Sequence, residues 1–214
     1  MTNDNARMST PKFLYFDLGK VLVDFSIDRM VDQVAEAAGT EPERVREVLF
    51  GGALQLQYET GRISTEEFYE AFCRRTGTRA APEGLLKAFN EIFKLNVSIV
   101  PVVAQLRAAG YPMGVLSNTC DAHWQHCVRR FRLLTDGLFR VQVRSYEVGA
   151  MKPDAAIFHA AAERAGVKPH RIFYTDDIPG HVEGARAVGF DAVTYTSTAA
   201  LVGELRRRGV RFNY

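Results

Sequence analysis

The sequence has few cysteines, no long apolar run and no apolar leader. Its three cysteines, Cys73, Cys120 and Cys127, are an odd number without the spacing of a disulfide framework, so we expect reduced thiols. No apolar run reaches the length of about 18 residues that is typical of a membrane-spanning helix. The polar start, residues 1–8, lacks the apolar core of a secretory signal. These absences predict a cytoplasmic protein without a membrane partner.

The sequence also lacks a strong charge of either sign. Its 27 basic and 25 acidic residues give a formal net charge of +2, which argues against a nucleic acid as the main partner. A content of 47% hydrophobic and 24% charged residues is typical of a globular protein. The length of 214 residues suits one domain with an insertion. A monomer is compatible with this composition.

Strand-like and helix-like segments alternate through the second half of the chain. A first apolar strand is predicted at residues 12–16, before this alternating region. Further strands are predicted at 113–116, 141–144, 171–175 and 192–195, with helices at 102–109, 154–165 and 198–208. Such alternation is typical of right-handed βαβ units. The predicted fold class is therefore α/β, a Rossmann-like, mostly parallel sheet flanked by helices.

The segment between the first two strands contains helix signals and no convincing strand. Thr40-Glu-Pro-Glu43 and Ser64-Thr-Glu-Glu67 both have the pattern of a helix capping box. We therefore predict a helical cap at 26–95, inserted into a core made of 11–25 and 96–214. The cap is expected to lie over the site and to select the substrate. Tyr58, Glu59 and Arg62 are candidates to face the site.

Polar residues collect just after four of the predicted strands. Ligands of open α/β sheets bind outside the carboxyl ends of the strands, so these residues are expected to share one rim. They are Asp17, Ser117 with Asn118, Lys152, and Asp176 with Asp177. Each alone has an ordinary interpretation, as a helix N-cap, a turn residue or a surface lysine. Their joint occurrence in this order argues for a functional site.

This set of side chains suits phosphoryl transfer. Three clustered carboxylates repel one another unless a cation joins them, and Mg²⁺ prefers oxygen ligands. With such a cation, the carboxylate of Asp17 can attack a phosphate monoester as a covalent nucleophile. Ser117 and Lys152 can donate to the phosphoryl oxygens, where charge lies in the transition state.

Four segments together resemble the motifs of the haloacid dehalogenase superfamily over nearly the whole chain after residue 11. They are Phe-Asp17-Leu-Gly-Lys-Val-Leu-Val-Asp24, Val-Leu-Ser117-Asn118-Thr, Ser-Tyr-Glu-Val-Gly-Ala-Met-Lys152-Pro and Phe-Tyr-Thr-Asp176-Asp177. The resemblance implies a Rossmann-like core with a helical cap of the first type, and hydrolysis of a small phosphorylated metabolite through an aspartyl-phosphate.

The resemblance also implies roles for individual residues. Asp17 is expected to be the nucleophile, and Ser117 and Lys152 are expected to bind phosphate, with Asn118 beside them. Asp17 and Asp177 are expected to hold Mg²⁺, together with the backbone carbonyl of Gly19, and Asp176 is a further candidate ligand. The sequence is most similar to the bacterial subgroup with Asp-Leu-Gly-Asn-Val in the first motif, which includes an α-D-glucose-1-phosphate phosphatase.

One position departs from the usual pattern of phosphatases in this superfamily. Two residues after the nucleophile, most of them carry a second Asp that protonates the leaving group, and this chain has Gly19. Such an acid typically contributes about a hundred- to ten-thousand-fold in rate. Lys20 and His181 are candidates to replace it. Without it, leaving groups that tolerate negative charge suffer least, which favours sugar 1-phosphates over 6-phosphates.

Two other hypotheses about function remain beside the phosphatase. A 2-haloacid dehalogenase keeps the nucleophile and lacks the second Asp, but it needs no cation and has no pair like Asp176-Asp177. A non-catalytic protein that binds phosphorylated metabolites would keep the site and lose turnover at Gly19. Cys120, His123 and Cys127 lie on one helical face and could bind Zn²⁺, but no second cysteine pair exists, so a helix facing the core is the preferred interpretation.

Overall fold

The core of the protein is a five-stranded parallel sheet. The computed structural model describes residues 10–214, and the strands follow the order β5-β4-β1-β6-β7. Their bounds are β1 Phe13–Phe16, β4 Met113–Ser117, β5 Val141–Arg144, β6 Ile172–Asp176 and β7 Asp191–Thr194. Every residue of β1, β4 and β6 is buried, as expected of strands covered on both faces. The predicted α/β fold class is confirmed.

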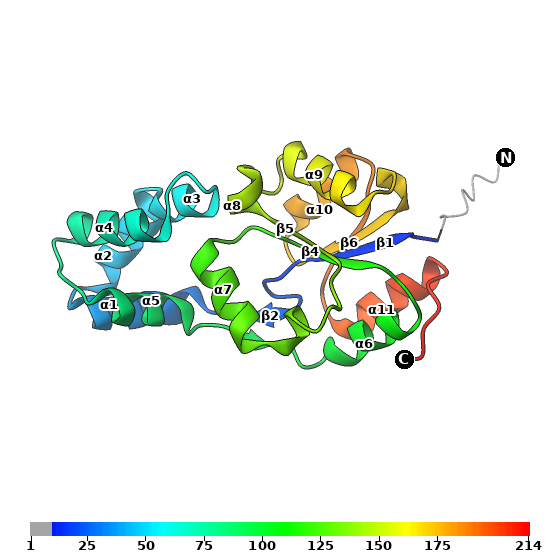
Figure 1. Cartoon of the computed structure of the whole chain (residues 1–214), viewed down its shortest axis with the longest axis horizontal. Coiled ribbons are helices and arrows are strands. Elements are labelled where there is room, and N and C mark those ends of the chain that lie inside the picture. Colours follow the sequence, from blue (N-terminus) through cyan, green and yellow to red (C-terminus); the bar gives the residue numbers. More distant parts are fainter. Residues whose placement is uncertain (1–9) are drawn as a thin grey trace.

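Helices cover both faces of this sheet (Figure 1). One face packs against α9 (Ala155–Ala165) and α10 (Pro179–Ala187), and the other against α6 (Val100–Ala108), α7 (Asp121–Arg130) and α11 (Thr198–Arg207). A short helix, α8 (Ser145–Val148), follows β5. Because β1 lies between β4 and β6, the chain order reverses beside β1. In open α/β sheets such a reversal creates a crevice at the carboxyl ends of the strands.

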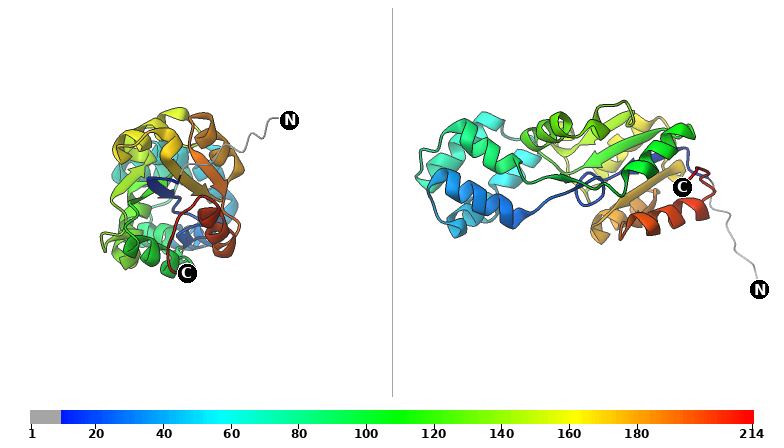
Figure 2. Two further views of the ribbon diagram at one scale, coloured as in Figure 1. Left: turned by 90° about the vertical axis from the view of Figure 1, so that its right-hand side faces the viewer. Right: turned by 90° about the horizontal axis from the view of Figure 1, so that it is seen from below.

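A group of helices stands beyond that end of the sheet, as Figures 1 and 2 show. It contains α1 (Ile27–Ala38), α2 (Pro42–Arg46), α3 (Leu54–Glu59), α4 (Thr65–Thr76) and α5 (Pro82–Asn90), with a π-helical turn at Glu47–Gly51. Apolar residues of these helices form a hydrophobic cluster that also includes Cys120 and Ala122 at the start of α7. The exact division at residues 25 and 95 stays a prediction.

Two details of this segment differ from the predictions. Two short strands, β2 (Val23–Asp24) and β3 (Lys94–Leu95), pair where the chain leaves and re-enters the core, although no strand was predicted at either place. A two-residue strand is too short to leave a periodic pattern. Thr40 is not the cap of α2, because Glu41 occupies the N-cap position and no side chain among residues 10–214 caps this helix. The Thr40 amide instead donates to Ala35 O at the end of α1. The second box is confirmed, with Ser64 and Glu67 capping each other.

The residues considered for zinc belong to the interior. Cys120, His123 and Cys127 are buried, and the His123 ring stacks on Phe89 with ring centroids 4.2 Å apart. Within residues 10–214, the side chains close enough to share a metal ion in a group of three are Asp17, Asp176 and Asp177. The interpretation of α7 as a helix facing the core is confirmed. No helix in this described part is long and apolar enough to cross a membrane.

The burial of the His123 ring leads to a prediction about the free energy of unfolding at acid pH. Burial lowers the pKa of His123 to about 4, whereas the unfolded chain binds this proton near pH 6.5. The unfolded state therefore gains the proton first as the pH falls, and folding stability decreases between these two values. Between pH 7 and pH 5, wild type should lose about 2 kcal/mol more unfolding free energy than His123→Phe, which keeps the stacking. Urea unfolding at both pH values measures this, with the exposed His159→Gln as control; equal losses in wild type and His123→Phe would contradict it.

Candidate active site

The predicted site residues meet at the carboxyl edge of the sheet. Asp17 follows β1, Ser117 ends β4, Asp176 ends β6, and Lys152 lies in the loop after α8. These four side chains are buried, whereas Asp177 is partly exposed. The alternation of strands and helices predicted this convergence, because the ends of parallel strands share one edge.

Lys152 is the centre of the hydrogen-bond network. Its Nζ donates to Asp17 Oδ1 at 2.8 Å and to Asp176 Oδ2 at 2.7 Å. It also contacts the Tyr174 hydroxyl at 3.0 Å and Leu116 O at 3.2 Å. Burial alone lowers the pKa of Lys152, but the carboxylates of Asp17 and Asp176 outweigh burial and raise it. Lys152 is therefore a buried ammonium held between two carboxylates.

Asn118 holds the main chain of Lys152 in place. Its Oδ1 accepts from Lys152 N at 2.8 Å, and its Nδ2 donates to Lys152 O at 3.0 Å. Both ends of the amide are thus engaged by one residue. Asn118, predicted as a substrate contact, fixes the position of Lys152 in this structure.

Asp17 is oriented through one of its two carboxylate oxygens. Leu18 N and Lys152 Nζ both donate to Oδ1, at 2.7 and 2.8 Å. No residue in the described range 10–214 donates to Oδ2, which leaves that oxygen for a ligand. Burial raises the pKa of Asp17 to about 7; Lys152 opposes this rise and Asp176 adds to it. The Asp17 carboxyl group thus needs nearby positive charge to stay ionised at neutral pH.

Asp176 and Asp177 are adjacent in sequence and differ in environment. Asp176 is fully buried and accepts from Lys152, Tyr174, His181 and Ile178 N. Burial disfavours its charge, but hydrogen bonds from His181 and Lys152 outweigh burial and lower the pKa of Asp176. The pKa of Asp177 is raised by burial and by Asp176. Because Asp177 is partly exposed and the oxygens of Asp176 already accept several hydrogen bonds, Asp177 is the better placed of the two to accept a cation.

The carboxylates form a candidate metal site. Ligand atoms of Asp17, Asp176 and Asp177 all lie within 4.8 Å of one another. Lys152 provides one ammonium against three carboxylates. Burial, with a further contribution from the charge of Asp176, raises the pKa of Asp17 and of Asp177. An oxygen-only donor set with excess negative charge fits a hard divalent cation such as Mg²⁺.

Sequence reasoning missed Tyr174 and the role of His181. Tyr174 precedes Asp176 by two residues on β6, so both side chains point to the same side of the strand. His181 lies on the first turns of α10, and its Nδ1 is 3.1 Å from both oxygens of Asp176. The period-two rule for strands could have identified Tyr174.

A small cavity of about 80 Å³ lies beside this network. It is lined by Gly19, Ser117 and Asn118 from the core, and by Gln55 and Glu59 from α3. Of the three residues that were candidates to face the site, Glu59 lines this cavity. Tyr58 is buried instead, with its hydroxyl accepting from Ala122 N at 3.0 Å.

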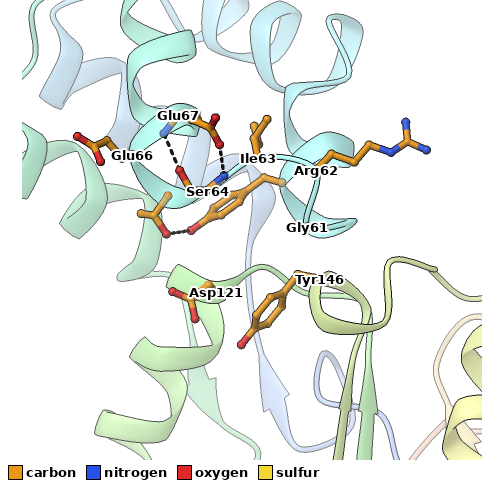
Figure 3. Close-up of a pocket in the computed structure, with 10 residues that line it drawn as sticks. Gly61, Arg62, Ile63, Ser64, Glu66, Glu67, Asp121 and Tyr146 are labelled. Carbon is orange, nitrogen blue, oxygen red and sulfur yellow. Dashed lines mark hydrogen bonds between the residues drawn. The ribbon is translucent and has the colours of Figure 1, made fainter.

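Arg62 lines a different and larger groove of about 530 Å³. Figure 3 shows Asp121 and Tyr146 facing the Ser64–Glu67 capping box across it. Gly61 packs directly against the main chain of Tyr146. A Cβ atom at position 61 would lie only 2.0 Å from Tyr146 O, so no larger residue fits there. The helices α1–α5 therefore meet the core closely at this edge.

Comparisons with known proteins agree with the fold and identify the family. A family model of haloacid dehalogenase-like hydrolases matches residues 11–189. A phosphatase of Mycobacterium tuberculosis is 29% identical over 183 residues, 83% of each protein. A glyceraldehyde 3-phosphate phosphatase of Methanopyrus kandleri is 28% identical over 165 residues, 73% of this chain and 69% of that protein.

A solved structure extends the comparison. The crystal structure of a family enzyme from Bacteroides thetaiotaomicron, in complex with magnesium and inorganic phosphate, superposes with a TM-score of 0.79. It is 25% identical, and the match covers 88% of this chain and 96% of that one. The family model alone spans far more than half of the chain, so the predictions of a hydrolase and of the superfamily are confirmed: the chain belongs to the haloacid dehalogenase-like hydrolase family.

Proposed function

We propose that this hydrolase is a Mg²⁺-dependent phosphatase that cleaves small phosphate monoesters through an aspartyl-phosphate on Asp17. The observation that carries the proposal is the cluster of three carboxylates within 4.8 Å around one buried ammonium, Lys152. Displacement of a halide from carbon does not require such a cluster. The names of the two curated relatives and the magnesium and phosphate of the solved structure support the same chemistry.

The residues at the carboxyl edge of the sheet have different roles in this reaction. In the first step Asp17 Oδ2 attacks phosphorus, the bond to the leaving oxygen breaks, and an acyl phosphate forms. In the second step water attacks phosphorus, inorganic phosphate leaves, and the Asp17 carboxylate is regenerated. Ser117 and Lys152 donate to the phosphoryl oxygens in both steps. Asn118, Tyr174 and Asp176 hold Lys152 in position.

The metal ligands in this proposal are Asp17, Asp177 and the backbone carbonyl of Gly19. Asp176 is a further candidate, although its oxygens already accept several hydrogen bonds. When bound, Mg²⁺ supplies the positive charge that allows an anionic nucleophile to approach an anionic phosphate. Lys152 alone offsets only part of that repulsion.

The helices of 26–95 act as a cap that selects the substrate in this proposal. Gln55 and Glu59 line the cavity opposite Gly19 and Ser117, which supports it. A cavity of about 80 Å³ is small beside common ligand pockets of about 300 Å³ and more, so compact phosphorylated metabolites should be preferred. Among hexose phosphates a sugar 1-phosphate is favoured, because the anomeric oxygen leaves more easily than an ordinary alcohol oxygen.

A substrate panel with and without metal tests the proposed function. Full-length protein is assayed on glucose 1-phosphate, glucose 6-phosphate, glyceraldehyde 3-phosphate and p-nitrophenyl phosphate. EDTA should lower phosphate release by about 10²-fold or more, and added Mg²⁺ should restore it. Undiminished activity in EDTA would contradict the metal site. Metal-independent chloride release from 2-chloropropionate would indicate a dehalogenase, and phosphate binding without turnover would indicate a binding protein.

A further inference from the structure

The place of the missing acid is filled by an aromatic ring. A Cβ built on Gly19 would lie 2.7 Å from Cε1 and 3.4 Å from Cδ1 of Phe25. Phe25 is itself packed against Phe93, with ring centroids 6.0 Å apart. The core therefore has no room for an acid beside Asp17 without moving Phe25, and a proton donor must come from another element.

Neither residue considered as a substitute lines the cavity at Gly19. Lys20 Nζ donates to Phe25 O at 2.6 Å and lies in an exposed position. His181 Nδ1 is engaged with both carboxylate oxygens of Asp176, and His181 is not among the residues that line the cavity. Both side chains are thus already engaged by other groups.

Two titratable side chains line the cavity, His123 and Glu59. His123 Nε2 lies 3.1 Å from Phe89 O, so this nitrogen must carry a proton and donate it to the carbonyl. Burial lowers the pKa of His123 to about 4, which keeps the ring neutral near pH 7. His123 therefore contributes to the packing of the cap against α7. Glu59 remains as the candidate proton donor in the cavity.

Glu59 is held in the cavity by one side chain of its own helix. Gln55 Nε2 donates to Glu59 Oε1 at 2.7 Å, one helical turn away. No residue within 10–214 donates to the second carboxyl oxygen. Gln55 is buried, and its Oε1 also has no partner among the described residues, so the pair offers polar atoms to a ligand in the cavity.

The environment of Glu59 favours its protonated form more than water does. Burial raises the pKa of Glu59; the hydrogen bond from Gln55 and the charge of Lys152 oppose this rise without cancelling it. Other groups near this carboxyl are Cys120, whose thiol stays protonated because burial raises its pKa, and the neutral His123. A raised pKa brings a carboxyl group closer to the value that suits proton transfer near neutral pH.

We propose that Glu59 is the general acid and base of the phosphatase reaction, supplied by the cap in place of the residue that Gly19 lacks. This inference rests on the proposed function and goes beyond it by naming the source of the proton. It assigns Gln55 as the residue that positions Glu59. It also makes chemistry depend on the cap, because α3 must lie against the core for Glu59 to reach the leaving group.

The proton balance of the two steps is simple. As the Asp17–phosphorus bond forms and the phosphorus–leaving oxygen bond breaks, the proton of Glu59 moves to the leaving oxygen and a neutral alcohol departs. Glu59 is then a carboxylate. It takes a proton from the water that attacks phosphorus, and so returns to its starting form when inorganic phosphate is released.

Leaving groups of different basicity test this role. For full-length protein with Mg²⁺, Glu59→Gln should lower kcat/KM for glycerol 1-phosphate by about 10²- to 10⁴-fold. For p-nitrophenyl phosphate, whose leaving group departs without a proton, the loss should stay below about tenfold. Glu59→Asp, which keeps the carboxyl group but shortens it, should fall between. Glu70→Gln, an exposed carboxylate on α4, should match wild type on both substrates.

Each other outcome has a distinct meaning. Equal losses on both substrates would overturn the inference, since a structural or binding role does not distinguish leaving groups. Unchanged activity of Glu59→Gln on glycerol 1-phosphate would overturn it as well. A wild-type protein that hydrolyses neither substrate would instead overturn the proposed function, which separates the two failures.

Discussion

Asp17→Asn should lower kcat by about 10⁴-fold or more, because it removes the nucleophile of a coupled catalytic set. The amide keeps the shape of the carboxylate, so Oδ1 can still accept from Leu18 N and Lys152. The fold should therefore remain, with an unchanged circular dichroism spectrum. Asp24→Asn replaces an exposed carboxylate nearby and should leave kcat unchanged. A variant at Asp17 with normal turnover would exclude covalent catalysis by this residue.

The second large effect is expected at Lys152. Lys152→Met should lower the unfolding free energy by about 3–5 kcal/mol, because two buried carboxylates then lose their shared partner. It should also lower kcat by about 10²- to 10³-fold through loss of a donor to the phosphoryl group. Denaturant unfolding without metal measures the first effect, and phosphate release with Mg²⁺ measures the second.

A matched control separates the network from a general effect of removing a lysine. Lys168→Met removes an exposed ammonium on the loop before β6 and should change neither quantity. Adding Mg²⁺ should restore part of the stability lost in Lys152→Met, because a cation bound near Asp17 and Asp176 offsets the same repulsion. Equal stability of Lys152→Met and wild type would show that the buried ion pairs contribute little.

The sheet and its rim could be predicted from the sequence because both follow short-range rules. Buried parallel strands are short apolar runs between helices, and their carboxyl ends share one edge. Asp17, Ser117, Lys152 and Asp176 therefore converge as expected, although the roles assigned to them stay predictions. The strands β2 and β3 were missed because a two-residue ladder depends on pairing between distant segments.

The cap side of the site could be predicted only in part, since Glu59 was a candidate to face the site and Gln55 was not. Gln55 and Glu59 reach the cavity only because α3 packs between the cap helices and the start of α7, a contact fixed by Tyr58 and Ala122. The sequence of α3 does not predict which side chains face the core, because Gln55 is buried and Leu56 is exposed. Likewise, the obstacle to an acid at position 19 is the ring of Phe25, six residues later, and no local rule predicts that contact.

The phosphorylated enzyme itself provides the most direct test of the account. Wild type is mixed with a substrate and Mg²⁺, quenched in acid during turnover, and treated with borohydride, which reduces an acyl phosphate to an alcohol. Peptide mass spectrometry should then find Asp17 converted to homoserine, and Asp176, Asp177 and Glu59 unchanged. Reduction at another carboxylate, or at none while phosphate is being released, would contradict covalent catalysis by Asp17.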